Sequence, residues 1–298
     1  MILVFGGTTE GRRVVEVLDE ATTPYYYSTR GTGQVIESAQ ARHIVGGMDD
    51  KEIATFCQKH DIKLIIDAAH PFAENLHRNI EIAAKELSLP VIRYERKYPE
   101  LPSDAVVCND WQDAIRKLND CPNLLALTGV ETIAKLKPYW QTHETWFRIL
   151  DRPTSWEIVR MEGFPEERIL IASLEGGKHS VSAANTSAII TKESGESGWF
   201  SEKVELARKM GASLFVVRRP TLPPWPTVTG PHGLRRAVEH CLPSFFPLHT
   251  GLTTGSCATA AAVAALRCLL GEEPMKAVHI ILPEGEEVSH PIQEATPG

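Results

Sequence analysis

Short apolar segments alternate with helix-forming stretches along most of this chain, and this alternation constrains its fold more than any other feature. Such short runs are typical of strands buried in a parallel sheet. Strands separated by helices form β-α units, in which helices cover both faces of the sheet. The predicted strands of the first part are Ile2–Phe5, Tyr25–Thr29, His43–Val45, Leu64–Asp67 and Val91–Tyr94, with helices near residues 10–20, 34–40, 49–60 and 72–87.

The second part of the chain repeats this pattern. Its predicted strands are Ala105–Cys108, Leu124–Leu127, Thr145–Ile149, Arg168–Ala172, Ala188–Thr191 and Leu214–Val217. Its predicted helices are Trp111–Leu118, Val130–Trp140, Ser155–Met161, Phe200–Met210 and His232–Cys241.

The segment Glu95–Asp104 separates the two parts, because it contains Pro99 and Pro102 and has no apolar periodicity. We therefore predict an α/β protein with two Rossmann-like lobes, mainly parallel sheets and a cleft between the lobes. Ligands in such folds bind at the carboxyl ends of the strands. The predicted domains are a nucleotide-binding lobe (1–98), a second lobe (99–243) and a short C-terminal appendage (244–298), which begins as a linker around Phe245 and Phe246.

The first predicted strand runs through a glycine-rich turn into a helix. Gly6, Gly7, Thr8, Thr9 and Gly11 combine backbone N–H groups, hydroxyls and room for close approach. A helix N-terminus of this kind suits a phosphate group. The match to the dinucleotide motif G-x-G-x-x-G is partial, because Thr8 stands where the middle glycine belongs. From the residues alone, a cofactor site and an ordinary strand–helix turn are about equally favoured.

The end of the second predicted strand bears on which cofactor would bind. Ser28, Thr29 and Arg30 stand there, without an acidic residue. An acidic side chain at this position binds the ribose of NAD, whereas an arginine accommodates the 2′-phosphate of NADP. The pattern favours NADPH, with NADH as the alternative.

His70 follows the strand Leu64–Asp67 and precedes Pro71, which suits the first turn of a helix. A helix N-terminus disfavours a charged imidazole, so we expect a neutral, hydrogen-bonding ring that Asp67 orients. The alternative is that His70 only caps the helix.

Lys192, Ser194 and Gly195 lie in a loop after the strand Ala188–Thr191. A cation, hydroxyls and glycines in such a loop can bind a carboxylate or a phosphate. Glu193 and Glu196 argue against phosphate, and a solvated loop is the alternative. Further cations stand at or just after predicted strand ends and can pair with carboxylates of a polyanionic ligand: Arg93, Arg96, Arg148, Arg152, Arg218 and Arg219.

Composition excludes several classes of function. The net charge of −7 argues against a broad nucleic-acid surface. The six cysteines are dispersed, which predicts reduced thiols in the cytoplasm and no protein-bound metal. We expect no secretory leader and no membrane-spanning segment.

Residues 1 to about 243 resemble the precorrin-6A reductases of cobalamin biosynthesis. The resemblance rests on Gly6–Gly11, Asp67–Ala73, Tyr94–Arg96 and Thr191–Gly195. It implies reduction of one double bond of a tetrapyrrole ring by NADPH or NADH, without flavin, with His70 and Lys192 as catalytic candidates and Arg96, Ser194 and Gly195 binding substrate. At residues 172–177, where the family has an Arg-Gly-Pro-Phe-like turn, this chain has Ala-Ser-Leu-Glu-Gly-Gly.

The segment Thr250–Ala262 resembles the start of the cobalt-precorrin-5B C1-methyltransferases. This second resemblance implies that the reductase acts on cobalt-precorrin-6A and contacts other enzymes of cobalamin synthesis. It covers too little of that domain to imply methyl transfer. Two alternatives stay open: a reductase of another acidic small molecule, and a non-catalytic tetrapyrrole carrier.

Overall fold

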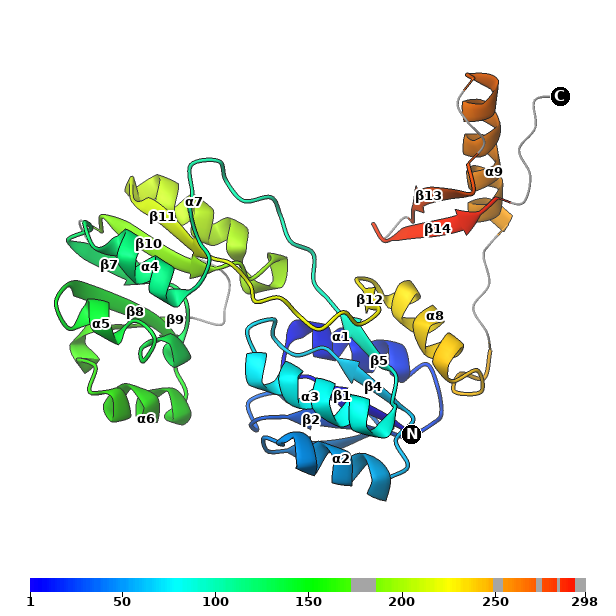
Figure 1. Cartoon of the computed structure of the whole chain (residues 1–298), viewed down its shortest axis with the longest axis horizontal. Coiled ribbons are helices and arrows are strands. Elements are labelled where there is room, and N and C mark those ends of the chain that lie inside the picture. Colours follow the sequence, from blue (N-terminus) through cyan, green and yellow to red (C-terminus); the bar gives the residue numbers. More distant parts are fainter. Residues whose placement is uncertain (173–185, 249–253, 272–274, 283–284, 293–298) are drawn as a thin grey trace. The chain divides into compact units, whose positions relative to one another are not determined.

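The computed structural model describes residues 1–172, 186–248, 254–271, 275–282 and 285–292. The chain divides into two compact units: Met1–Glu95 together with Leu222–Gly298, and Arg96–Thr221. Each unit contains a six-stranded parallel sheet, and a two-stranded antiparallel sheet lies near the C-terminus (Figure 1). The predicted α/β class with two mainly parallel sheets is confirmed, whereas the cleft between the lobes stays a prediction.

The first sheet has the strand order β12-β5-β4-β1-β2-β3. Strand β1 is central, so Phe5 lies opposite both Ser28 and Asp67 in register. This register brings the ends of three strands to one edge of the sheet. The strands are β1 (Ile2–Phe5), β2 (Tyr25–Thr29), β3 (Ala41–Val45), β4 (Leu64–Asp67), β5 (Val91–Tyr94) and β12 (Thr227–Val228), and the helices are α1 (Thr9–Leu18), α2 (Asp50–Lys59), α3 (Glu74–Leu87) and α8 (Pro231–Cys241).

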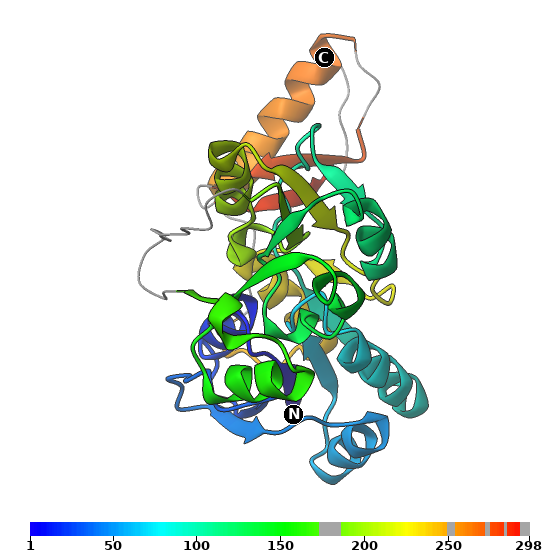
Figure 2. The same ribbon diagram turned by 90° about the vertical axis from the view of Figure 1, so that its left-hand side faces the viewer.

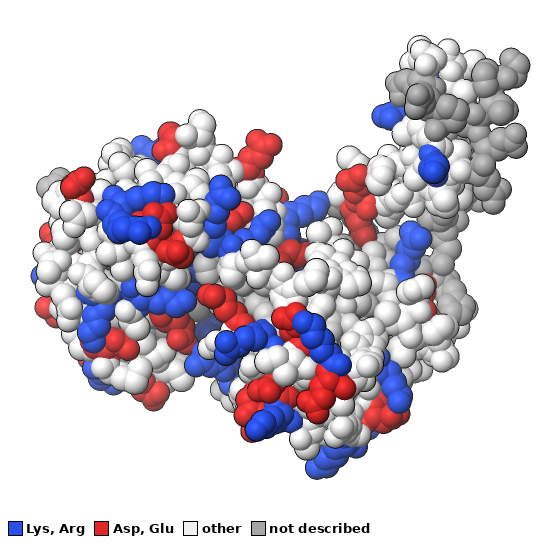
Figure 3. Space-filling model, viewed as in Figure 1, with Lys and Arg blue, Asp and Glu red and all other residues white. Residues whose placement is uncertain are grey.

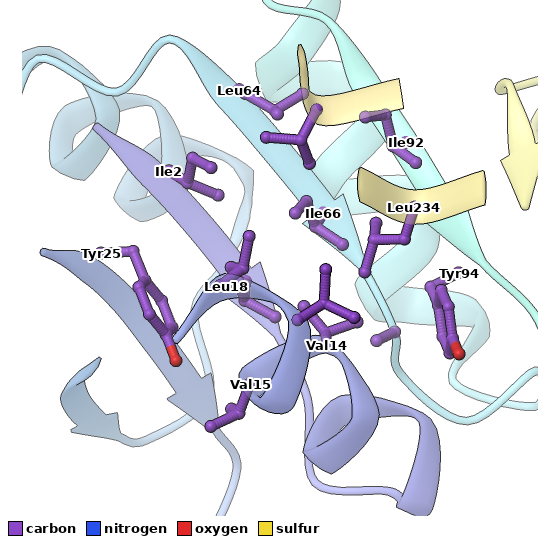
Figure 4. Close-up of a cluster of buried hydrophobic side chains, with 14 of the residues drawn as sticks. Ile2, Val14, Val15, Leu18, Tyr25, Leu64, Ile66, Ile92, Tyr94 and Leu234 are labelled. Carbon is purple, nitrogen blue, oxygen red and sulfur yellow. The ribbon is translucent and has the colours of Figure 1, made fainter. Parts of the chain in front are cut away.

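Two apolar layers hold the helices against this sheet. Leu18 of α1 and Leu234 of α8 are fully buried and lie around Ile66 of β4 on one face (Figure 4). On the other face, Ile53 of α2 and Ile80 of α3 pack with apolar residues of β1 and β4. Full burial of such a side chain contributes roughly 1.5–3 kcal/mol, so both layers matter to stability.

The chain returns to the first unit after its second lobe, which corrects the predicted domain 99–243. Strand β12 pairs with β5, and Val238 of α8 is buried in the core of the first unit. Strand β12 has two residues and follows a proline-rich segment, so no strand pattern marks it in the sequence. Phe245 and Phe246 also belong to this core, so their segment is packed and is not a free linker.

The second sheet has the order β6-β11-β10-β7-β8-β9, with all neighbours parallel. Phe200 and Val204 of α7 cover one face of it with Leu125 and Ile189. Phe164 contacts both Trp140 and Phe147 edge to face. The strands are β6 (Val106–Cys108), β7 (Asn123–Ala126), β8 (Glu144–Leu150), β9 (Ile169–Ala172), β10 (Ala188–Lys192) and β11 (Ser213–Val217), and the helices are α4 (Trp111–Leu118), α5 (Lys137–Trp140), α6 (Pro153–Glu162) and α7 (Phe200–Met210).

The C-terminal segment contains helix α9 (Thr254–Leu269) and a hairpin of β13 (Ala277–Ile281) and β14 (Glu287–Pro291). In both ribbon views the hairpin lies beside the helix (Figures 1 and 2). Ala260 and Ala264 pack against Val278 and Val288, so this segment has a small apolar cluster of its own.

Two predicted helices differ in the structure. Residues 34–40 form no helix, because the Ser38 hydroxyl accepts hydrogen bonds from Gln40 N and Ala41 N and leads the chain into β3. The predicted helix Val130–Trp140 is divided into a 3-10 turn, Val130–Thr132, and α5. Pro138 lacks the N–H that a continuous helix requires, and it lies in the first turn of α5.

Among the described residues, no helix is both long enough and apolar enough to cross a membrane.

All six cysteines are free thiols. Residues 173–177, in the departure from the family turn, and Thr250–Thr253, in the second resemblance, lie outside the described residues.

Candidate functional site

Thr8 connects the glycine-rich turn to helix α1. Its side chain caps the helix by accepting from Gly11 N at 3.0 Å, and its hydroxyl donates to the carbonyl of Ala68 at 2.7 Å. Gly7 has a φ of +88°, which disfavours any residue with a side chain. A Cβ on Gly7 would meet no atom within 4 Å, so the turn is open on that side.

Tyr27 of β2 lies beneath this turn. A Cβ on Gly6 would overlap the Tyr27 ring, and a Cβ on Gly11 would overlap the Tyr27 hydroxyl, so packing alone requires both glycines. The Tyr27 hydroxyl accepts from Gly7 N at 3.1 Å, and burial raises the pKa of this phenol.

Gln34, which the sequence analysis did not single out, also binds the turn. Its side-chain oxygen accepts from Gly7 N at 3.0 Å and from the Tyr27 hydroxyl at 2.6 Å. Its side-chain nitrogen donates to the carbonyl of Thr8 at 2.8 Å. The carboxamide therefore occupies the N–H group that the sequence analysis assigned to a phosphate. The position of Gln34 after the second strand does not by itself indicate that its side chain binds the turn.

Ser28 and Thr29 are buried at the end of β2, whereas Arg30 is exposed. The Thr29 hydroxyl donates to the carbonyl of Gly31 at 2.9 Å and lies 2.7 Å from Nε2 of His43, in the adjacent strand. The structure thus places Arg30 at the same sheet edge as the glycine-rich turn, with His43 as an additional polar neighbour.

Asp67 orients His77 rather than His70, which corrects the predicted pairing. Its carboxylate lies 2.8 Å from His77 Nδ1 and 3.0 Å from the Arg93 guanidinium. Burial alone would raise the pKa of Asp67, but the hydrogen bond from His77 and the charge of Arg93 hold it below the usual range. His77 could have been identified from the sequence as a polar residue on the buried face of the predicted helix.

His70 lies in the connection between β4 and α3 and is half-buried. Its Nδ1 accepts from Phe72 N at 3.2 Å, and its carbonyl oxygen is 3.0 Å from His77 Nε2. Because Nδ1 is an acceptor, a neutral ring carries its proton on Nε2. Helix α3 begins at Glu74, so His70 caps the preceding turn and not the helix itself.

In the second unit, the structure brings Arg96, Ser194 and Gly195 together. Nη1 of Arg96 donates to the carbonyl of Ser194 at 2.8 Å, and both residues are buried. Gly195 has a φ of +67°, and a Cβ there would lie 2.7 Å from both Arg96 Cδ and the carbonyl oxygen of Lys97. Close packing on Arg96 therefore fixes the loop.

Lys192 ends β10, and burial lowers its pKa to about 8, assisted by the charges of Lys135 and Arg96. Lys203, on the buried face of α7, lies near the same loop, with Nζ 3.4 Å from Ser194 Oγ. No motif in the sequence marks Lys203. The sequence feature that could have identified it is its spacing: Lys203 stands beside Val204 at a position of α7 where an apolar residue is expected.

No group of three or more His, Cys, Asp or Glu side chains in the described part of the chain is arranged to hold a metal ion. Positive and negative side chains are interspersed over the face shown in Figure 3.

The predicted site residues form two groups, one at the sheet edge of each unit.

Comparison with protein families gives two matches. A family model described as precorrin-6x reductase CbiJ/CobK matches residues 1–241, and a model described as CbiD matches residues 244–297.

Curated relatives carry related names. A cobalt-precorrin-6A reductase of Methanocaldococcus jannaschii is 27% identical over 229 residues, covering 74% of this chain and 91% of the relative. A precorrin-6A reductase of Rhodococcus erythropolis is 28% identical over 238 residues, covering 75% and 90%. A solved structure described as CobK precorrin-6A reductase shares the fold, with a TM-score of 0.65 and 18% identity over 81% of this chain and 97% of that one.

Proposed function

Because this chain belongs to the precorrin-6x reductase family, we propose that it reduces one double bond of cobalt-precorrin-6A with a nicotinamide cofactor. The family match over residues 1–241 carries this proposal, and it agrees with the resemblance seen in the motifs. The CbiD match of the C-terminal segment supports the cobalt-containing substrate, since the sequence resemblance relates that segment to the cobalt-precorrin methyltransferases. A tetrapyrrole carrier and a reductase of another acidic molecule are not favoured.

We infer that the glycine-rich turn holds the cofactor. The N-terminus of α1, the open side of Gly7 and the Thr8 and Thr9 hydroxyls fit a pyrophosphate. Gly6 and Gly11 allow the turn to lie close to Tyr27. Ser28 and Arg30 support NADPH over NADH through the 2′-phosphate. When bound, the reduced nicotinamide supplies a hydride, and a proton completes reduction of the double bond.

Candidate substrate-binding residues are proposed in each unit separately. His70, with its proton on Nε2, is a hydrogen-bond donor or proton relay for the ring. Lys192 pairs with a carboxylate arm. Arg96, Ser194 and Gly195 bind substrate beside it, and Arg96 adds a second positive charge. We propose no flavin and no protein-bound metal, and a cytoplasmic location, where free thiols stay reduced.

An anaerobic assay tests the function directly. Purified protein is mixed with cobalt-precorrin-6A or with precorrin-6A, and with NADPH or NADH. The expected result is stoichiometric oxidation of the cofactor and formation of a dihydro product, fastest with cobalt-precorrin-6A and NADPH. A protein that binds the tetrapyrrole without oxidising either cofactor would be a carrier. A bound yellow flavin that turnover requires would contradict the cofactor assignment.

A further inference from the structure

We propose that Lys203, together with Arg96 and Lys192 beside the same loop, forms a buried subsite for one carboxylate arm of the substrate, with Lys203 as its innermost cation. This inference rests on the proposed function, because it assigns to that reaction a binding residue that neither the motifs nor the comparisons identify.

The hydrogen bonds of Lys203 provide the first argument. Its side chain is only 8% exposed, and its ammonium group has three donors. Within the described residues, one acceptor is found for them, Ser194 Oγ at 3.4 Å. A buried ammonium group with incomplete hydrogen bonding is costly, and an oxygen-rich anion would supply the missing acceptors.

The surrounding charges provide the second argument. The groups that act on Lys203 are Arg148, Lys192 and Arg96, which are cations, and Glu202, which is an anion. Lys192 in turn lies in the electrostatic field of Lys135 and Arg96, which are cations, and of Glu131, which is an anion. Positive charge therefore exceeds negative charge around Lys203, although the buried setting makes each charge expensive. Burial, assisted by the neighbouring cations, lowers the pKa of Lys203 to about 7.

The contact between Lys203 of α7 and the loop after β10 provides the third argument. Ser194 receives the Lys203 contact at its hydroxyl and the Arg96 bond at its carbonyl, and its hydroxyl also lies 3.2 Å from the carbonyl of Gly198. These contacts hold the loop after β10 around the cations. A carboxylate is the anion of choice, because the proposed substrate carries acetate and propionate arms.

Steady-state kinetics of two variants on the same helix test the subsite. Lys203→Met removes the buried charge, whereas Lys209→Met removes an exposed lysine of α7 and serves as control. The KM for cobalt-precorrin-6A should rise about tenfold in Lys203→Met and stay unchanged in Lys209→Met, since a charge-assisted bond is lost. The KM for NADPH should not change in either, and Lys203→Arg should recover part of the loss. An unchanged KM for the tetrapyrrole in Lys203→Met, with normal wild-type reduction, would overturn this inference alone.

Competitive acetylation of the wild-type protein gives a second test that does not depend on how the variants fold. Lys203 and Lys209 are labelled with acetic anhydride across pH, and the labelled peptides are quantified. Saturating cobalt-precorrin-6A without reduced cofactor should protect Lys203 and raise its apparent pKa, while Lys209 is unaffected. Protection by NADPH alone, or none by the tetrapyrrole, would overturn the subsite. Protection without any reduction by the wild-type protein would contradict only the proposed function.

Discussion

The side-chain oxygen of Gln34 lies 3.0 Å from the backbone nitrogen of Gly7 and accepts its hydrogen bond. In the turn that is proposed to hold the cofactor, the Gly7 N–H is thus occupied by an uncharged group of the same chain, although the Cβ side of Gly7 is open. A cofactor phosphate that binds Gly7 N must displace this carboxamide, so Gln34 competes with the cofactor at a single N–H group.

Substitutions of Gln34 test this competition. Gln34→Ala removes the competing oxygen and should lower the KM for NADPH by about two- to fivefold, a difference of about 0.4–1 kcal/mol. Gln34→Glu places a carboxylate beside the phosphate and should raise that KM by about tenfold or more. Steady-state kinetics with cobalt-precorrin-6A held saturating measures both. Equal effects of the two variants would contradict the competition.

Arg30 tests the choice of cofactor. The residue is exposed at the end of β2, where a guanidinium can reach a 2′-phosphate. Arg30→Asp should raise the KM for NADPH by about tenfold and leave that for NADH within about twofold. Arg30→Lys, which keeps a charge, is the matched control. Equal changes for the two cofactors in Arg30→Asp would show that Arg30 does not bind the phosphate.

Removal of the His77 side chain should mainly lower stability, whereas removal of the His70 side chain should mainly lower kcat. His77 is buried against Asp67 and the carbonyl of His70, so His77→Ala should lower the free energy of unfolding by roughly 3 kcal/mol. His70→Ala should lose at most about 1 kcal/mol but reduce kcat, because its ring is proposed to act on substrate. Urea unfolding and turnover distinguish them. Wild-type kinetics in His70→Ala would contradict its assignment.

Lys203 should make stability depend on pH in a defined direction. The pKa of Lys203 is lowered from its ordinary value of 10.5 to about 7 in the folded protein. Between these pH values the unfolded chain binds a proton that the folded chain has released. The free energy of unfolding that is lost by burying Lys203 is therefore largest below pH 7 and decreases as the pH rises towards 10.5. Lys203→Met should therefore stabilise the protein by roughly 1–3 kcal/mol at pH 6 and by less at pH 9. Denaturant unfolding at both pH values measures this, and a gain that grows with pH would contradict it.

The strand pattern predicted most of the fold because each parallel strand is a short apolar run. Thr227–Val228 escaped prediction, since a two-residue strand has no periodicity and its pairing with β5 depends on contacts distant in sequence. Gln34 and His77 escaped for a similar reason. Their partners, Gly7 and Asp67, are 27 and 10 residues away, and only the folded sheet edge brings them together.

The C-terminal segment contacts helix α8 through Glu286. Its carboxylate accepts from His232 N at 3.0 Å and from Gly233 N, in the first turn of α8. A protein that ends at Leu248 loses this capping group but keeps Phe245 and Phe246 in the core. We expect unchanged reductase activity and a loss of only about 1 kcal/mol in unfolding free energy, typical of a helix cap.

Glu286→Ala in the full chain is the matched control and should reproduce that small loss, whereas Phe246→Ala should cost roughly 3–5 kcal/mol because it empties a core position. Thermal unfolding and the anaerobic assay compare all three. If ending the chain at Leu248 abolished activity or cost as much as Phe246→Ala, the segment from residue 249 onward would be an integral part of the reductase fold. The contact through Glu286 would then be only a small part of what that segment contributes.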